Sequence, residues 1–326
     1  MSMQLLTATE YVTQATRAIQ QAQKRVHVIA MVIADHDATH DFITALQDAA
    51  KRGVTVSVAA DVFTYGEVTG SFLPLRYYSK GGRSATSMAK KLKTAGVSFH
   101  WLGHGRVTIF NGRTHSKWCV VDDVSFVFGG VNLYQQGIEH IDYMFKVNDA
   151  RLADRLAKEQ GKILQAERTA TNYSSVGFQL DNHTVLFDGG IMAHSLIYRR
   201  VCELARSAEH VTFVSQYCPT GKLAKYLKAT SHSLYFNRPA QATLFNRLLI
   251  KLNMFLTGFK TMYTGDTYIH AKCIIFTHSD GTKTAITGSH NFAYAGVLFG
   301  TREIALETKD PAIIQQLETF LDAQVR

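Results

Sequence analysis

The sequence predicts an α/β protein made of two similar halves. In each half, segments whose apolar residues recur at helical spacing alternate with short apolar runs bounded by turn residues, which is the pattern of strands. A His-x-Lys pair followed by an apolar run occurs at His115 and again at His270, 155 positions later in a chain of 326 residues. Because two accidental copies of such length are improbable, we predict an internal duplication with two α/β domains related by a pseudo-twofold axis.

The first half alternates helices and strands before its His-x-Lys pair. Its first strand, at 26–33, is an apolar run of the kind expected of a strand buried on both faces. Gly53 follows the second helix at the position where glycine commonly ends a helix. The expected elements are helix 8–23, strand 26–33, helix 41–51, strand 54–60, helix 87–95 and strand 96–101. This order favours parallel crossovers in a layered α/β architecture.

Residues 64–86 interrupt the alternation. Aromatic and basic residues mix there with glycine and serine, among them Tyr65, Phe72, Arg76, Tyr77, Tyr78, Lys80 and Arg83. One interpretation is a solvated loop. The other is an aromatic and basic rim that meets a phosphate-bearing surface.

The first His-x-Lys pair begins a strand, a tight turn and a second strand. Because side chains two apart in an extended strand point to the same face, His115 and Lys117 project together. Two buried strands are joined by an acidic turn at Asp122, and the second ends at Gly129-Gly130-Val131-Asn132, near the level of His115. A histidine, a lysine and an Asn amide converging there can hold an anionic oxygen and offer a nucleophile.

The second copy repeats this pattern with two differences. It carries His270 and Lys272 and closes with Gly288-Ser289-His290-Asn291. Thr277 stands where the first copy has its turn aspartate, and the hairpin is longer, with Asp280 inside it as a candidate replacement. We expect the missing turn aspartate to affect the local stability of the second half, because this aspartate takes part in the chemistry less directly than the histidine and the lysine.

The order of elements restarts after the first motif. A strand at 139–147 and a helix at 151–165 complete the first half, and residues 167–175 form the expected linker. The second half continues with strand 184–187, helix 193–206, strand 211–215, helix 223–229, strand 234–236, helix 242–257 and a strand near 260–263. We therefore predict domains at 1–166 and 167–326.

The helix at 242–257 has two interpretations. One broad stripe carries Leu244, Phe245, Leu248, Leu249, Leu252, Phe255 and Leu256, and it continues to Phe259. We favour a core helix packed on the sheet. The alternative is an interfacial segment that inserts into a membrane surface beside its charges.

Composition restricts the class of protein and its partners. Hydrophobic residues make up 46% and charged residues 19%, as in ordinary folded domains. The four scattered cysteines favour free thiols in a reducing compartment, and the sequence shows neither a signal-peptide pattern nor an apolar run of about 20 residues that could span a bilayer. A net charge of +9 favours an anionic partner, either a phospholipid surface or nucleic acid.

The paired motifs resemble the duplicated motif of the phospholipase D superfamily, His-x-Lys-x4-Asp followed by Gly-Gly/Ser-x-Asn. Within it, the first motif is most similar to cardiolipin synthases and related bacterial phosphatidyl-transferases. This narrower similarity rests on Ala95-Gly96-Val97, on Asn111-x-Arg113-x-His115-x-Lys117 and on Ile141-Asp142-Tyr143. The resemblance covers nearly the whole chain and implies two tandem phospholipase D-like α/β/α domains. Thr277 departs from the motif, and the transmembrane helices of some cardiolipin synthases are missing.

The resemblance implies one site at the interface of the halves, with no metal and no cofactor. One imidazole forms a phosphohistidine, the other protonates the leaving alcohol, and lysines and Asn amides stabilise the developing charge. The implied catalytic residues are His115, Lys117, Asp122, Asn132, Asp142, His270, Lys272, Asn291 and Glu303, and the implied substrate-binding residues are Arg113, Gly130 and Ser289.

We predict His115 as the nucleophile and His270 as the general acid and base. The resemblance also implies that carboxylates orient the histidine of the opposite half, Glu303 with His115 and Asp142 with His270. The expected activity is that of a phosphatidyl-transferase forming cardiolipin from a phospholipid substrate and an alcohol acceptor. We expect a cytoplasmic monomer associated peripherally with an anionic membrane surface. A phospholipase D-type hydrolase, a nuclease acting on nucleic acid, and a non-catalytic binding module are the alternatives.

Overall fold

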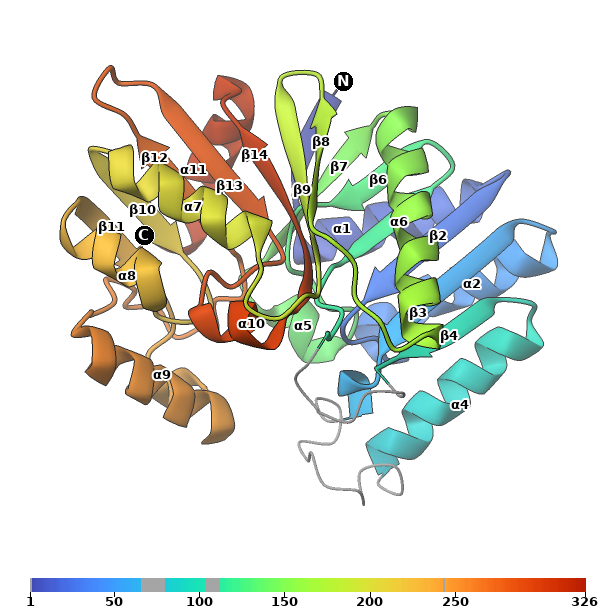
Figure 1. Ribbon diagram of the computed structural model, residues 1–326. Helices are drawn as coiled ribbons and strands as arrows, with labels where there is room; N and C mark the ends of the chain where they lie inside the picture. Colours follow the sequence, from blue (N-terminus) through green and yellow to red (C-terminus); the bar gives the residue numbers. More distant parts are fainter. Residues whose placement is uncertain (1, 66–79, 104–111, 243) are drawn as a thin grey trace.

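The computed structural model describes residues 2–65, 80–103, 112–242 and 244–326. The first half forms a mixed sheet in the order β1-β7-β6-β5-β2-β3-β4 (Figure 1). Its strands are β1 (Ser2–Thr7), β2 (Arg25–Ala30), β3 (Thr55–Asp61), β4 (Ser98–Leu102), β5 (Trp118–Val121), β6 (Val124–Val127) and β7 (Tyr143–Asn148). Its helices are α1 (Ala8–Gln21), α2 (His40–Lys51), α4 (Lys80–Thr94), α5 (Gln135–Glu139) and α6 (Ala150–Arg168), with a short 3₁₀ turn at Asp37–Thr39.

The second half forms a second mixed sheet in the order β11-β10-β12-β13-β14-β9-β8. Its strands are β8 (Val176–Leu180), β9 (His183–Gly189), β10 (His210–Val214), β11 (Ser231–Tyr235), β12 (Cys273–Thr277), β13 (Lys283–Gly288) and β14 (Arg302–Thr308). Its helices are α7 (Leu196–Ser207), α8 (Gly221–Lys228), α9 (Leu244–Thr257), α10 (Tyr294–Phe299) and α11 (Pro311–Gln324), with a 3₁₀ turn at Pro239–Gln241.

The two sheets repeat one strand order, which confirms the predicted pair of α/β halves. Read from β3 to β1, the first sheet corresponds strand by strand to the second read from β11 to β9. The strands β2, β3 and β4 pair in parallel through the crossovers made by α2 and α4, as predicted, and β10 pairs in parallel with β11. The remaining strand pairs are antiparallel, including the hairpins β5–β6 and β12–β13 that follow the two His-x-Lys pairs.

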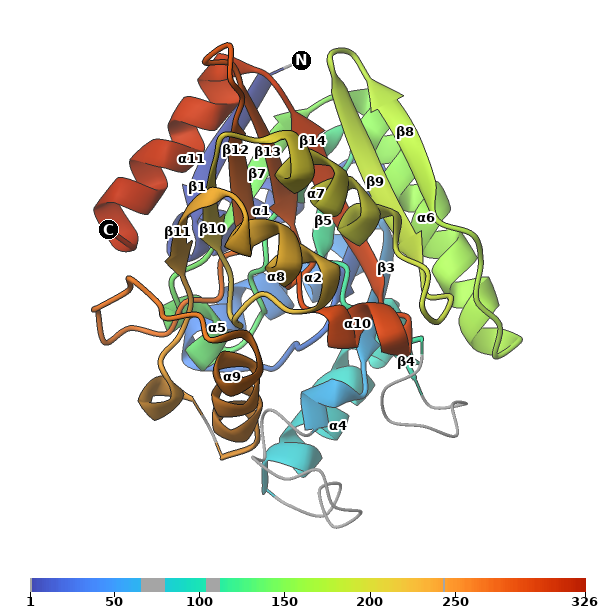
Figure 2. The same cartoon turned by 60° about the vertical axis from the view of Figure 1, so that its left-hand side comes forward.

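A shared core lies between the two sheets. It contains side chains of α6 and α11, such as Leu156 and Leu317, together with strand residues of both halves, such as Phe145 and Leu306. Helices α6 and α11 lie at opposite sides of the strands (Figure 2). Two further cores form on the outer sheet faces, under α1, α2 and α4 in the first half and under α7 and α8 in the second. The division at residues 166 and 167, which falls inside the last turn of α6, remains a proposal.

Three expected elements differ from the observed ones. Residues 260–263 form no strand, and the first-half strand expected from residue 139 begins only at Tyr143, after helix α5. Helix α9 leaves much of its predicted core stripe in solvent, with Leu248, Leu252, Phe255 and Leu256 all more than half exposed. The core interpretation of this helix is therefore wrong for these side chains. Residues 66–79 of the predicted aromatic and basic segment lie outside the described residues, and residues 80–86 belong to helix α4, which begins seven residues before the helix expected at 87–95.

Asp122 supports the fold instead of the chemistry. It sits in the β5–β6 turn with a φ of 50°, and its carboxylate accepts hydrogen bonds from the backbone N–H groups of residues 23–25 at 2.9–3.0 Å. Partial burial raises its pKa, but these three donors outweigh burial and hold the pKa below its usual value. Asp122 does not line the cavity that contains His115. The catalytic assignment of Asp122 is thus corrected to a structural one.

The second half lacks an equivalent carboxylate. Thr277 ends β12, and its carbonyl accepts from the Glu209 backbone N–H at 2.9 Å, as the neighbouring strand begins. Asp280 is used within the hairpin itself, where it accepts from the Thr282 backbone and hydroxyl. Asp280 therefore does not replace the motif aspartate.

Asp122→Ala is expected to lower the free energy of unfolding while leaving the catalytic machinery intact. Loss of a charged acceptor for three backbone donors at a partly exposed turn should cost about 1–3 kcal/mol. Urea unfolding monitored by circular dichroism measures this change. Turnover of the folded variant at low temperature should stay within about threefold of the wild type, because even an indirect effect through β5 is small compared with losing a catalytic group. A loss of turnover without a loss of stability would contradict the structural assignment.

Candidate active site

Two short backbone bridges join the halves and position the motif residues. Thr114 pairs with Arg302 in one bridge, and Ile141 pairs with Ile269 in the other. The carbonyl of Arg302 accepts from the N–H groups of residues 115 and 116, and the carbonyl of Ile141 accepts from those of residues 270 and 271, all at 2.8–2.9 Å. His115 directly follows Thr114, and Glu303 directly follows Arg302. In the other bridge, Asp142 follows Ile141 and His270 follows Ile269. This pseudo-symmetric pairing places each histidine beside the carboxylate of the other half.

His115 and Glu303 form one crossing pair. The Nδ1 atom of His115 lies 2.9 Å from Glu303 Oε2, and both side chains are buried. Glu303 also accepts hydrogen bonds from the hydroxyls of Ser289 at 2.5 Å and Thr301 at 3.0 Å. A carboxylate that accepts from Nδ1–H leaves the Nε2 lone pair of the imidazole available to attack.

His270 and Asp142 form the other crossing pair. The distance from His270 Nδ1 to Asp142 Oδ2 is 2.6 Å. Asp142 accepts in addition from the backbone N–H groups of Gly130 at 3.1 Å and Tyr143 at 2.8 Å. The predicted crossing of carboxylates and histidines is therefore confirmed as geometry, and the catalytic roles remain predictions.

Gly130 and Ser289 support the carboxylates and do not line the cavity, and their role in substrate binding stays a prediction. A Cβ atom at Gly130 would lie 2.7 Å from Asp142 Oδ2 and 2.9 Å from Lys272 Nζ, so this position requires glycine. Ser289 occupies the corresponding place in the second half, where its hydroxyl bonds to Glu303. The difference between the two motif endings thus reflects the different groups packed beneath them.

The two lysines lie beneath the histidines. Lys117 Nζ donates to the carbonyl of His115 at 2.8 Å, and Lys272 Nζ donates to the carbonyl of His270. Both ammonium groups are buried and neither lysine lines the cavity. Burial lowers the pKa of Lys117 to about 7 and that of Lys272 to about 8. A phosphodiester bound in the cavity would draw these lysines toward the charged form.

The two motif asparagines face the cavity. Asn132 and Asn291 both line it, and the Oδ1 atom of each is buried with no hydrogen-bond partner among the described residues. Because a buried amide oxygen without a partner is costly, these side chains are arranged to meet a group that enters the cavity. Arg113 also lines the cavity, and its guanidinium is 2.8 Å from the buried Asp61 carboxylate.

A single cavity of about 610 Å³ contains both histidines. Its polar wall includes a network in which Gln216 Nε2 donates to the hydroxyls of Tyr217 and Tyr268. Its other lining residues include His140 and His290 and an apolar group made of Met31, Val32, Phe63, Leu249 and Phe299. Sequence reasoning missed this wall. Of these residues, only Tyr268 and His140 could have been found from the sequence, because Tyr268 lies two residues before His270 and His140 lies two residues before Asp142.

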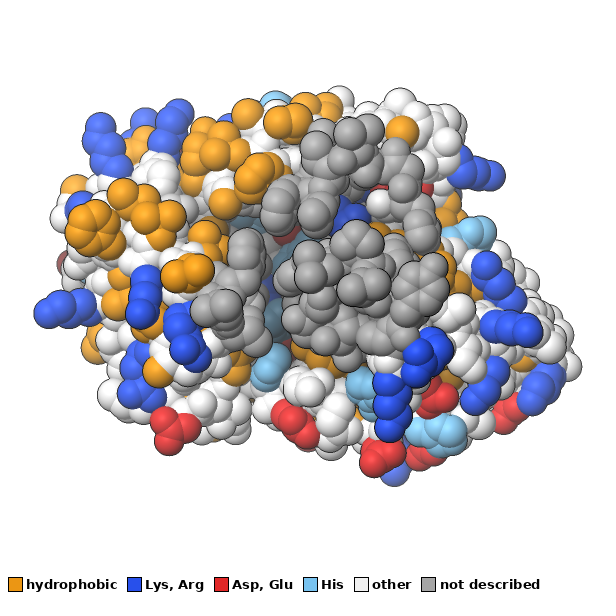
Figure 3. Space-filling view, turned by 90° about the horizontal axis from the view of Figure 1, so that it is seen from below, with side chains coloured by type: hydrophobic (Ala, Val, Ile, Leu, Met, Phe, Trp, Pro, Cys, Tyr) orange, Lys and Arg blue, Asp and Glu red, His pale blue; other side chains and the backbone are white. Residues whose placement is uncertain are grey.

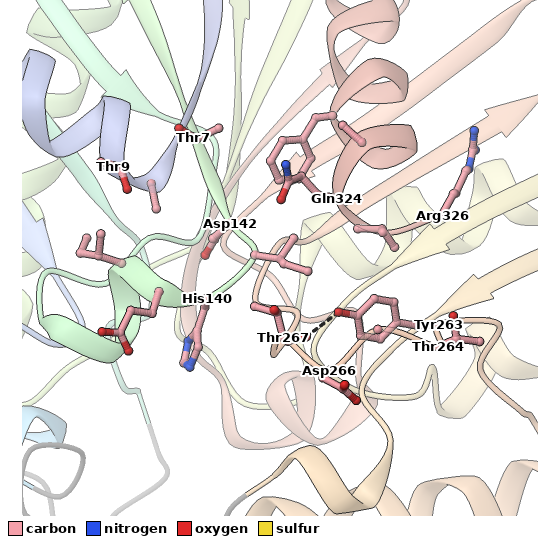
Figure 4. A pocket seen from close by; sticks show the side chains of 18 residues that line it. Thr7, Thr9, His140, Asp142, Tyr263, Thr264, Asp266, Thr267, Gln324 and Arg326 are labelled. Carbon is pink, nitrogen blue, oxygen red and sulfur yellow. Dashed lines mark hydrogen bonds between the residues drawn. The ribbon is translucent and has the colours of Figure 1, made fainter.

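A second cavity of about 490 Å³ lies at the seam near the end of α11 (Figure 4). Thr7, Tyr263, Asp266 and Arg326 are among its lining residues, and His140 lines both cavities. It contains neither His115 nor His270, so it is not the candidate active site. Within the described ranges, no group of three or more His, Cys, Asp and Glu side chains is arranged to hold a metal ion.

Attack by His115 requires its neutral imidazole, so kcat/KM should fall in acid. Burial lowers the pKa of His115 to about 4, even though Glu303 raises it, and burial also lowers the pKa of His270. Protonation of His115 removes the attacking lone pair, so we expect kcat/KM to decrease about tenfold per pH unit below about pH 4. Initial rates measured after brief exposure to each pH, with recovery checked at pH 7, test this. An acid limb near pH 6.5 would contradict it.

The comparisons with known proteins agree with this geometry. Residues 15–164 match the family described as cardiolipin synthase, PLD-like domain. The fold resembles phosphatidylserine synthase from Haemophilus influenzae Rd KW20, with a TM-score of 0.73, 16% identity, and coverage of 98% of this chain and 85% of that one. It also resembles polyphosphate kinase from Porphyromonas gingivalis, with a TM-score of 0.63, 11% identity, and coverage of 99% and 47%. No curated protein sequence matches the chain.

These findings define the class of protein. The family match of residues 15–164 and the repetition of their strand order in the second half support assignment to the phospholipase D superfamily. The two similar structures, at these low identities, support the fold alone.

Proposed function

We propose that the chain is a phosphatidyl-transferase that moves a phosphatidyl group from one alcohol to another and forms cardiolipin from phosphatidylglycerol. The observation that carries the proposal is the pair of histidines from opposite halves lining one cavity. Each histidine has its Nδ1 atom on a buried carboxylate. Two imidazoles held in this way supply a nucleophile and an acid–base group to the same phosphorus atom.

In the first step, His115 Nε2 attacks phosphorus as the bond to the leaving alcohol oxygen breaks, and His270 gives that oxygen its proton. Binding of the anionic phosphodiester favours the protonated form of His270 that this step needs. In the second step, His270 removes the proton of the acceptor alcohol, whose oxygen attacks phosphorus and releases His115. Atoms and charges balance without an external co-reactant. The Nδ2–H groups of Asn132 and Asn291, which line the cavity, would donate to the phosphoryl oxygens, and the buried lysines beneath the histidines would add positive potential there.

The assignment of His115 as nucleophile rests on the electrostatics of its partner. Although burial raises the pKa of Glu303, its interaction with His115 lowers the pKa to about 2, so the carboxylate stays ionised. Burial raises the pKa of Asp142, and Lys272 lies 3.1 Å from the Nδ1 atom of His270. The positive charge of a phosphoimidazolium is therefore better stabilised at His115 than at His270.

A lipid substrate is supported by the apolar part of the cavity wall. Met31, Val32 and Phe63 come from the first half, and Leu249 and Phe299 from the second. Acyl chains against these side chains would exclude water and favour attack by an alcohol over hydrolysis. A phospholipid substrate also agrees with the name of the similar phosphatidylserine synthase, a structure that at 16% identity shows the fold alone. In this proposal the protein acts as a single chain that associates peripherally with the surface of an anionic membrane.

Lipid product analysis tests the substrate class. Purified protein is incubated with vesicles of phosphatidylglycerol and, separately, with single- and double-stranded nucleic acid. We expect cardiolipin and released glycerol from the vesicles. Phosphatidic acid as the main product would indicate a phospholipase D-type hydrolase. Cleavage of nucleic acid that disappears in His115→Ala, with no lipid turnover, would overturn the proposal in favour of a nuclease. The net charge of +9 would support nucleic-acid binding in that case.

A further inference from the structure

Helix α9 exposes an apolar stripe that no other described residue covers. The exposed fractions are 85% for Phe255, 66% for Leu256, 60% for Leu248 and 53% for Leu252. These positions follow i, i+4, i+7 and i+8 spacing and so share one face of the helix. The opposite face is used within the protein, where Ile250, Asn253 and Thr257 are buried. The exposed stripe is thus additional to the residues that hold α9 in place.

Exposed apolar side chains also come from α10, which lines the same cavity as α9, and from the loop that packs against α10. Leu298 and Phe299 of α10 are 44% and 42% exposed, and Ile191 and Met192 before α7 are 37% and 55% exposed. The Ala193 N–H donates to the Val297 carbonyl at 2.8 Å, so this loop packs directly against α10. We call these eight side chains the apolar rim: Ile191, Met192, Leu248, Leu252, Phe255, Leu256, Leu298 and Phe299.

The apolar rim adjoins the mouth of the active-site cavity. Phe299 belongs to both, because it lines the cavity and is also exposed at the surface. Leu249 of α9 lines the cavity one residue from exposed Leu248. Figure 3 shows hydrophobic side chains gathered over one part of the face that contains a central hollow, with histidine side chains visible in that hollow. Apolar side chains of α9 and α10 therefore lie both at the exposed surface and on the wall of the cavity that contains the histidines.

The charges beside the stripe indicate its partner. Arg247 and Lys251 are exposed on α9, adjacent to the stripe, and the helix has no acidic residue. In a twofold dimer made through this face, each patch would meet its own copy and bring like charges together. An anionic bilayer instead satisfies both features, since acyl chains accept the apolar side chains and phosphate headgroups attract the cations.

We propose that the apolar rim docks on an anionic phospholipid bilayer and turns the cavity mouth toward the lipid. The docking proposal adds a membrane partner and an orientation of the active site to the proposed function. It rests on the proposed function for the identity of the substrate. Docking in this orientation lets a phospholipid enter the cavity along Phe299 and Leu249 while its acyl chains stay in an apolar environment.

Vesicle flotation tests the docking surface. Wild-type protein and the double variant Leu252→Ser/Phe255→Ser are mixed with phosphatidylcholine vesicles that contain or lack phosphatidylglycerol. Both replaced side chains are exposed, so the fold should be retained, which circular dichroism checks. We expect the double variant to partition at least about tenfold more weakly, because two apolar side chains no longer enter the bilayer. Unchanged flotation of this folded variant would overturn the proposal.

A charge pair provides the matched control. Lys251→Glu should weaken binding to vesicles containing phosphatidylglycerol by about tenfold or more, since the reversal removes one attraction and adds a repulsion. Lys158→Glu makes the same change of net charge on α6, away from α9 (Figure 1), and should have a small effect. Equal losses for both variants would contradict a local docking surface. A wild-type dimer that the double variant converts to a monomer, with flotation unchanged, would identify a second copy as the occupant.

Activity on dispersed substrate separates this proposal from the proposed function. With phospholipid dissolved in detergent micelles, the double variant should turn over at the wild-type rate, whereas its rate on vesicles should fall with its binding. Rim-dependent flotation without any lipid turnover would support docking and overturn the proposed function. Equal losses of activity in micelles and on vesicles, with normal flotation, would place these residues in the catalytic machinery and overturn docking.

Discussion

His115→Ala is expected to lower the rate of phosphatidyl transfer by a factor on the order of 10⁴ or more, because it removes the nucleophile. Single-turnover kinetics with a fluorescent phospholipid measure the loss directly. The protein should remain folded, since the side chain faces a cavity and the Glu303 carboxylate keeps its bonds to Ser289 and Thr301.

His270→Ala provides the contrast that separates the two roles. A substrate with an activated leaving group, such as a nitrophenyl phosphodiester, leaves without a proton, so this variant should still form the covalent intermediate. His115→Ala should remain inactive toward the same substrate. A burst of nitrophenol from His115→Ala, with none from His270→Ala, would reverse the assignment.

Glu303→Gln is expected to reduce kcat by about 10²- to 10⁴-fold, because a neutral amide neither holds the reactive tautomer as firmly nor stabilises the positive charge that forms on His115. The pH profile adds a readout that a purely structural role would not change. Since Glu303 raises the pKa of His115, its loss should move the acid limb of kcat/KM below its wild-type position near pH 4.

Glu307→Gln is the matched control on the same strand. Glu307 forms an ion pair with Arg200 at 2.6 Å, outside the cavity, so the same chemical change there removes a surface interaction. We expect kcat to change by less than about twofold, since such pairs contribute little. Equal effects of the two substitutions, or an unchanged acid limb in Glu303→Gln, would contradict the orienting role.

The residues at the centre of the site could be predicted because the motifs occur twice. His115, Lys117, His270 and Lys272 were identified from their spacing and from the apolar runs that follow them. The crossing of Glu303 to His115 was implied only by family resemblance, since no local pattern reveals it. Its physical basis is the pair of backbone bridges at the seam, which joins residues 188 positions apart at Thr114 and Arg302.

The catalytic role of Asp122 was implied by its place in the family motif, and nearness in sequence to Lys117 does not bring it near the histidines. A strand carries the chain about 3.3 Å per residue, so β5 takes the chain from Lys117 to the far end of the sheet. The cavity wall was missed for the converse reason. Gln216 follows β10 and Phe299 ends α10, and only the tertiary fold brings these residues to the histidines.

Helix α9 illustrates a second limit of periodicity. A stripe that faces a protein core and one that faces an external apolar partner have the same composition and spacing. The sequence therefore could not separate the two interpretations. Burial did so, because Phe255 is 85% exposed while Ile250 on the other face is fully buried.

Trapping the covalent intermediate tests the central claim most directly. Wild-type protein mixed with a labelled phospholipid is quenched in alkali, where phosphohistidine persists, and its peptides are mapped by mass spectrometry. We predict a phosphatidyl group on the peptide that contains His115, and its disappearance when an alcohol acceptor is added before the quench. An adduct on His270, or turnover with no histidine adduct at any time, would contradict the account.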